Sequence, residues 1–179
     1  IMPSLVGSEM CIRDRWEGLD DAAAERHAVS AVREADRSGD PEAVCRALGA
    51  FGYLAYGPDH DDAREPAARR LLTVAADLER GDHVAVAYFQ LFLAACARAD
   101  LVAARAELDR ALAAAAGTQL LELVGVAELF DALVHALAGD VDEAVRRYDA
   151  LSRDMAEQGL SLASVFGLIS RVMRAQATG

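Results

Sequence analysis

One apolar face recurs in three segments of the chain, and this repetition limits the possible folds more than any other feature. In each segment the apolar residues fall at i, i+3, i+7 and i+11, which places them on one side of an α-helix. Such a helix cannot bury its face alone, so equal faces at regular intervals predict helices that stack in sequence order. The three stripes are Val44-Ala47-Phe51-Ala55, Val86-Phe89-Leu93-Ala97 and Val126-Leu129-Leu133-Leu137.

The segments that follow these stripes carry a second repeated face with smaller side chains. Its members are Ala68-Leu72-Ala75, then Ala104-Leu108-Ala111 at an offset of 36, then Ala144-Tyr148-Leu151 at an offset of 40. Two alternating kinds of helix predict a hairpin of two helices repeated three times, with one partial helix before the array and another after it. The predicted fold class is therefore all-α, a solenoid of stacked α-α hairpins.

Turn residues divide the chain into about eight predicted helices. In Ser38-Gly39-Asp40-Pro41 the glycine suits the left-handed end of one helix, the aspartate can cap the next, and proline fits its first turn. Arg80-Gly81-Asp82 and Ala138-Gly139-Asp140 are expected to act in the same way, and Asp140 with Glu143 has the spacing of a capping box. The predicted helices span 20–37, 41–56, 64–80, 83–98, 101–116, 119–138, 141–157 and 160–176.

The first residues differ in character from the remainder. Residues 5–14, Leu-Val-Gly-Ser-Glu-Met-Cys-Ile-Arg-Asp, resemble a translated transposon-end sequencing adapter over ten consecutive positions. The stretch has none of the features of a secretory signal peptide. We therefore expect residues 1–15 to be a non-native, adapter-derived segment. Residues 16–179 are expected to form one helical-repeat domain, a fragment of a larger protein.

Charge and composition exclude several classes of function. The formal net charge is −11, so the chain repels phosphate backbones and anionic lipid surfaces. No apolar run approaches the ~20 residues that span a bilayer. Cys45 and Cys96 lie among apolar neighbours and are expected to be buried, and the chain shows no disulfide framework. We predict a cytoplasmic protein that binds neither nucleic acid nor membrane.

Particular motifs add a family resemblance. Asp140–Tyr148 (DVDEAVRRY) and Ala99–Leu112 (ADLVAARAELDRAL) resemble the second helix of a tetratricopeptide repeat (TPR), although the period exceeds the usual ~34 residues. The segments SGDPEAVCRAL, YGPDHDDARE and AGDVDEAVRRYDAL resemble the helical-repeat regions of large bacterial signalling ATPases. These include LuxR-type and antibiotic-regulator-type transcription factors and ATPase-linked nucleotide cyclases. The resemblance covers about residues 27–176.

This resemblance implies a TPR-like, right-handed superhelix that senses or scaffolds in signal transduction or transcription regulation. The implied partner is a protein or peptide, or an intramolecular ATPase domain. The ATPase itself would lie outside this segment, because a chain without lysine has no Walker loop. Uncapped ends of the array could also associate with one another. Candidate contacts on the concave face are Arg46, Tyr53, Tyr88, Gln90, Glu128 and Asp131.

The signals for catalysis are weaker than those for a scaffold, and we predict no catalytic residue, cofactor or metal. The alternative is a stand-alone helical small-molecule binder, metal binder or enzyme that uses the acidic turn at 59–62. The simpler interpretation of that turn is a cap for the next helix. His83 is expected to be exposed and His135 to pack within the array. The aromatic residues could line a pocket but are expected to be core: Phe51, Phe89, Phe130 and Phe166.

Overall fold

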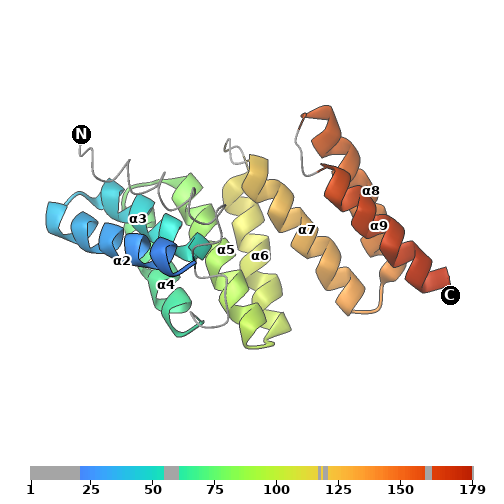
Figure 1. Ribbon diagram of the computed structural model, residues 1–179, viewed down its shortest axis with the longest axis horizontal. Coiled ribbons are helices and arrows are strands. Elements are labelled where there is room, and N and C mark those ends of the chain that lie inside the picture. Colours follow the sequence, from blue (N-terminus) through green and yellow to red (C-terminus); the bar gives the residue numbers. More distant parts are fainter. Residues whose placement is uncertain (1–20, 55–60, 117, 119–120, 160–162, 179) are drawn as a thin grey trace. The chain divides into compact units, whose positions relative to one another are not determined.

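The computed structural model describes residues 21–54, 61–116, 118, 121–159 and 163–178. These residues form eight α-helices and no strand, which confirms the all-α class (Figure 1). Residues 1–15, predicted to be adapter-derived, lie outside the described residues. The helices are α2 (Asp21–Ser38), α3 (Pro41–Leu54), α4 (Asp61–Asp77), α5 (Gly81–Ala97), α6 (Leu101–Ala115), α7 (Leu121–Leu137), α8 (Val141–Glu157) and α9 (Ala163–Thr178).

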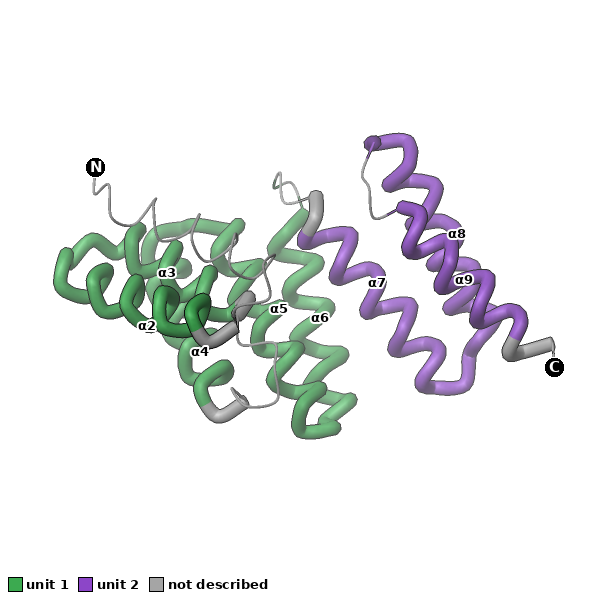
Figure 2. The backbone as a smooth tube through the Cα atoms, viewed as in Figure 1, with its two compact units in different colours: residues 1–118 green, residues 119–179 purple. Residues whose placement is uncertain are grey.

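The helices belong to two compact units, residues 1–118 and residues 119–179 (Figure 2). In the first unit each helix from α2 to α6 packs against the next, and α3 also contacts α5. In the second unit α7 packs against α8, and α8 packs against α9. Neighbours in sequence are therefore neighbours in space within each unit.

The helices begin at regular intervals along the chain. Seven successive starts lie 20 residues apart, which gives a hairpin period of 40 residues. That period agrees with the offset of 40 predicted between the stripes of α5 and α7, whereas the predicted offset of 42 between Val44 of α3 and Val86 of α5 is two residues too long. The starts are Asp21, Pro41, Asp61, Gly81, Leu101, Leu121 and Val141.

The even-numbered helices bury the same four positions of the 40-residue period. Most of these positions hold alanine, which lets a neighbouring helix approach closely. The sets are Ala24-Ala28-Ala31-Ala35, Arg64-Ala68-Leu71-Ala75, Ala104-Leu108-Ala111-Ala115 and Ala144-Tyr148-Leu151-Met155. The predicted offset of 36 between α4 and α6 is therefore wrong by four residues, and Leu71, not Leu72, is the buried leucine. A shift of four residues rotates a helical face by only about 40°, so the apolar pattern alone fits both registers.

The odd-numbered helices follow the predicted stripe in the first unit only. Val44, Ala47 and Phe89 are buried as expected, but Ala97 is exposed and Ala55 lies outside the described residues. In α7 the prediction is wrong at Leu137, which is 64% exposed. Four of the five buried positions described in α7 instead match those of α5 forty residues earlier, the exception being Leu123. These pairs are Ala85 with Gly125, Ala87 with Ala127, Leu91 with Asp131 and Phe92 with Ala132.

Three inter-helix turns close with one hydrogen-bond pattern. After α4, α5 and α7 a residue with positive φ ends the helix, and the next amide donates to a carbonyl five residues back, as in a Schellman motif. The left-handed residues are Glu79 (φ 55°), Ala99 (φ 55°) and Gly139 (φ 87°). A common turn keeps the linkers equal in length and so preserves the 20-residue spacing.

The predicted caps are confirmed at two of the three turn motifs. Gly39 has φ 67°, and the Asp40 carboxylate accepts the Glu42 amide at 3.0 Å. The Asp140 carboxylate likewise accepts the Glu143 amide at 3.3 Å. The return bond of a full capping box is not formed, because the Asp140 amide donates to the His135 carbonyl.

The Arg80-Gly81-Asp82 motif does not act as predicted, because it is displaced by two residues from the other turns. Glu79 takes the left-handed position and Gly81 is the first residue of α5. Arg80 occupies the capping position without a side-chain cap. Its guanidinium instead binds Asp82 at 2.9 and 2.6 Å and also pairs with Glu42 of α3. The motif therefore joins α3 to the start of α5.

A glycine notch on α3 receives a polar side chain from α5. Gln90 is 3% exposed, and its Nε2 donates to the Gly49 carbonyl at 3.2 Å. A methyl group at Gly52 would overlap the Gln90 carboxamide, whereas one at Gly49 would lie 3.9 Å from Val86. The contact between α3 and α5 therefore depends on the absence of a side chain at Gly52.

Alanine substitutions at these two glycines should have opposite effects. Gly49→Ala should be neutral or stabilise by up to about 1 kcal/mol, through helix propensity. Gly52→Ala should destabilise by about 1–2 kcal/mol, because Gln90 loses its buried bond. Urea denaturation measures both. The Gly52→Ala penalty should disappear in a Gln90→Ala background, and an equal penalty there would contradict the notch.

The left-handed turn residues give a second matched pair. Ala99→Gly should stabilise by about 0.5–1 kcal/mol, because glycine adopts positive φ without the strain of a β-carbon. Gly139→Ala should destabilise by about 1 kcal/mol. A methyl group at Gly139 would meet nothing within 4 Å, so its effect reports the backbone conformation alone. Thermal unfolding followed by circular dichroism tests the pair, and changes of equal sign would contradict this account.

Candidate functional site

The predicted contact residues of the first unit occupy different environments. Arg46 is exposed on α3, whereas Gln90 is buried between α5 and α3. Tyr88 is half-buried on α5, and the Arg110 guanidinium lies 6.0 Å from its ring centroid. The side chain of Tyr53 lies outside the described part of the structure. The structure thus makes Gln90 an internal packing residue and leaves Arg46 at the surface.

The two predicted contacts of the second unit lie on α7 and face charged groups of α8. Asp131 is 8% exposed and pairs with Arg147, which also donates to Glu143 at 2.7 Å. The pKa of Glu128 is raised, mainly because its carboxyl is partly desolvated and secondly because the negative charges of Asp154 and Asp131 lie nearby. The structure therefore places Glu128 and Asp131 in one acidic region, in which an arginine neutralises Asp131.

The acidic turn of the alternative hypothesis falls mostly outside the described residues. Asp59 and His60 are not described, and Asp61 and Asp62 are the first two residues of α4. Across the described ranges, no group of three or more His, Cys, Asp or Glu side chains could hold a metal ion. The described helices also include none with the length and apolar character needed to cross a bilayer.

His83 and the two described cysteines are packed rather than presented to solvent. The prediction of an exposed His83 is wrong, because its side chain is 15% exposed and Nε2 lies 3.5 Å from a Glu42 oxygen. The closeness of α3 to the start of α5 covers it. Cys45 is fully buried as predicted, and burial, then the charge of Glu42, raises the pKa of its thiol. Cys96 is half-buried, and burial raises its pKa too. Raised thiol pKa values are unfavourable for nucleophiles.

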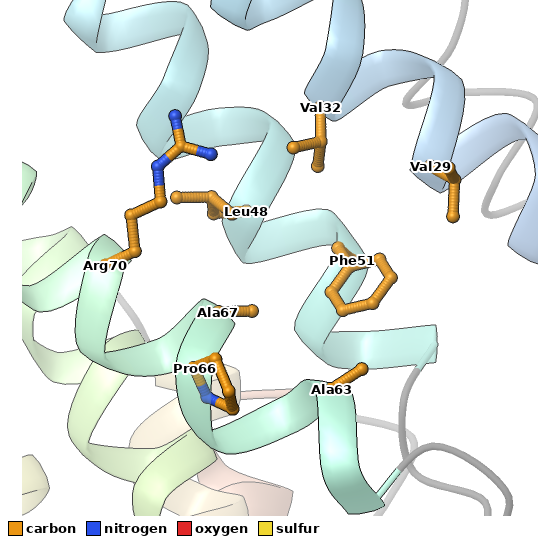
Figure 3. Close-up of a pocket in the computed structure, with 8 residues that line it drawn as sticks. All are labelled: Val29, Val32, Leu48, Phe51, Ala63, Pro66, Ala67 and Arg70. Carbon is orange, nitrogen blue, oxygen red and sulfur yellow. The ribbon is translucent and has the colours of Figure 1, made fainter.

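An open apolar pocket lies between three successive helices of the first unit (Figure 3). Its volume is about 340 Å³, near the lower end of the range for small-ligand pockets. Side chains from α2, α3 and α4 surround it, and Arg70 is the one charged residue among them. The lining residues are Val29, Val32, Leu48, Phe51, Ala63, Pro66, Ala67 and Arg70.

The size of the pocket follows from the small residues that α4 contributes to it. Ala63 and Ala67 lie one turn apart and leave space opposite Phe51 and Val29 (Figure 3). Arg70 reaches from α4 to α2, where Nη1 donates to Asp36 at 3.3 Å and Nη2 forms an ion pair with the same carboxylate. Because Asp36 neutralises Arg70, the pocket favours an uncharged apolar group.

Only one residue of this pocket, Phe51, was predictable from the sequence as a possible pocket residue. Phe51 is half-buried and lines it, whereas Phe89 and Phe166 are buried in the core as expected, and Phe130 is half-buried. Nothing in the periodic pattern distinguishes the pocket-lining alanines of α4 from packing alanines. Val29 is a partial indication of the pocket, because it is an apolar residue that lies outside the buried alanine face of α2 and is 41% exposed.

Comparison with known proteins adds no assignment: no family model, curated protein or solved structure matches the chain. The pocket and the charged region of α7 and α8 are therefore interpreted from their own residues.

The raised pKa of Glu128 predicts a pH-dependent effect of its removal. Ionising this carboxyl costs more in the folded than in the unfolded chain, so the cost grows as pH rises through its ordinary value of 4.5 and is absent well below it. Glu128→Gln should thus stabilise the chain slightly at neutral pH, by less than about 1 kcal/mol, and have no effect near pH ~3. Denaturant titrations across pH measure this, with exposed Glu157→Gln as the control. A pH-independent gain would contradict the cause.

Proposed function

We propose that this chain is a non-catalytic scaffold that binds a protein segment or a small effector. In this proposal the helices form a TPR-like, right-handed solenoid, which serves as the sensor region of a cytoplasmic bacterial signalling ATPase or transcriptional regulator. The ATPase or DNA-binding activity would reside in other parts of that protein.

Helix packing in the first unit supports the repeat architecture. Helix starts recur every 20 residues, and α3 contacts α5, the corresponding helix of the next hairpin. Contacts between corresponding helices of successive hairpins are what a stacked array requires, because each hairpin buries its apolar face against the next. Surfaces of such arrays are built from several repeats, and this favours recognition of extended partners.

The observation that carries the binding proposal is the apolar pocket across α2, α3 and α4. It is open to solvent, apolar, and large enough for one bulky side chain or a small apolar effector. Arg70 at its edge is held by Asp36, so a neutral anchor enters without leaving a charge unpaired. A peptide that inserts a leucine, phenylalanine or methionine fits this chemistry best.

Peptide display against the whole chain tests the proposal. Selected peptides should share one large apolar anchor, and Ala67→Leu should weaken them at least about tenfold by filling the pocket. Ala76→Leu is the matched control, because Ala76 is exposed on the same helix and lines no part of the pocket.

Fluorescence anisotropy with a selected peptide provides the measurement. Loss of affinity in Ala67→Leu, with affinity retained in Ala76→Leu, would support the scaffold. Equal affinity in both variants, or the absence of selectable peptides, would reject the pocket as the recognition site.

A further inference from the structure

The last helix, α9, is apolar on two faces. One face is buried through Ala163 and Phe166, with Ile169 packed against the same core. The other carries Val165, Leu168 and Val172, which are 46%, 55% and 48% exposed. Their spacing of three and four residues places them in one stripe along the helix. A surface helix of a globular protein normally has a polar outer face, so this stripe is unusual.

Charge sets α9 apart from the rest of the chain. It contains Arg171 and Arg174 but no acidic residue, and each of the other described helices has at least one, in a chain of net charge −11. Arg174 pairs with Asp149 of α8. Arg171 is exposed beside the stripe and makes no ion pair with any described residue. The exposed face of α9 is therefore apolar with a positively charged border.

We propose that the α9 stripe, defined as Val165, Leu168, Val172 and the bordering Arg171, is a docking surface for an acidic amphipathic helix of a partner protein. Helices dock on apolar surfaces through residues at i, i+3, i+4 and i+7, and the stripe presents three of these positions, i, i+3 and i+7. Acidic residues beside the partner's apolar face would pair with Arg171. The proposal concerns the second unit and does not depend on the pocket of the first.

Two other occupants fit the charges less well. A second copy that packed α9 against α9 would bring arginines together on facing helices, and like charges oppose that contact. An anionic membrane presents a broad negative surface, which would also repel the acidic groups elsewhere in a chain of net charge −11, whereas a single helix contacts only the stripe. An acidic helix satisfies both the apolar stripe and its border.

A pair of designed peptides tests the proposal on the full chain. Each is a labelled, alanine-based helix of about 18 residues with leucines at i, i+3 and i+7. One peptide has glutamates beside the leucines and the other has lysines at the same positions. Fluorescence anisotropy at about 0.15 M salt, which screens the distant acidic groups, should show about tenfold tighter binding of the glutamate peptide.

Substitutions then locate the contact. Leu168→Glu should weaken the glutamate peptide at least about tenfold, and Arg171→Glu should reverse the preference in favour of the lysine peptide. Val102→Glu is the control, because Val102 is 85% exposed on α6 and should have no effect. Arg171 is at the surface, so Arg171→Glu should keep the helical circular dichroism, and this is checked first.

Three results would overturn the proposal. The first is equal binding of the two peptides, or a preference that Arg171→Glu leaves unchanged. The second is Leu168-dependent dimerisation in sedimentation without peptide binding, which would assign the stripe to a second copy. The third is binding to phosphatidylglycerol vesicles without peptide binding, which would assign it to a membrane. Ala67→Leu should leave peptide binding at α9 intact, so failure of the pocket and failure of the stripe are distinguishable.

Discussion

Close approach of helices at repeated small residues is the constraint on which the fold depends. The buried face of α2 consists of alanine at all four positions of the repeat, and α6 has alanine at three of them. Alanine loses no side-chain entropy on burial, so such a face packs at low conformational cost. At two places a glycine faces a large side chain: a methyl group at Gly125 would overlap Met155, just as one at Gly52 would overlap Gln90. Helix positions are thus set by matched volumes.

The turns extend this local matching along the chain. Three linkers of equal length close with the same bonds although their left-handed residues are Glu79, Ala99 and Gly139. Glutamate and alanine pay a steric cost at positive φ, so the packing on both sides must favour the common turn enough to offset it. The hairpin period therefore follows from tertiary packing as much as from the turn residues.

Features that depend on a few adjacent residues were predictable from the sequence, whereas features that depend on contacts between helices were not. The helical class, the start of α8 and the caps at Asp40 and Asp140 depend on a few adjacent residues and were predictable. The register of α4 was not, because two registers four residues apart show nearly the same apolar face. The burial of His83, the notch at Gly52 and the pocket each require several helices together. No periodic signal of one helix contains that information.

The two proposed binding surfaces differ in chemistry, and this difference would allow recognition of more than one kind of group. At the pocket, Asp36 cancels the charge of Arg70, so that site favours neutral apolar anchors. On α9, Arg171 lies beside exposed leucine and valine without an acidic partner among the described residues, so that site favours an apolar face with negative charge. In an acidic chain, an unpaired arginine beside apolar residues is where an acidic partner meets the least repulsion. Binding at α9 would then be steered by charge, whereas binding at the pocket would depend on shape and apolar burial.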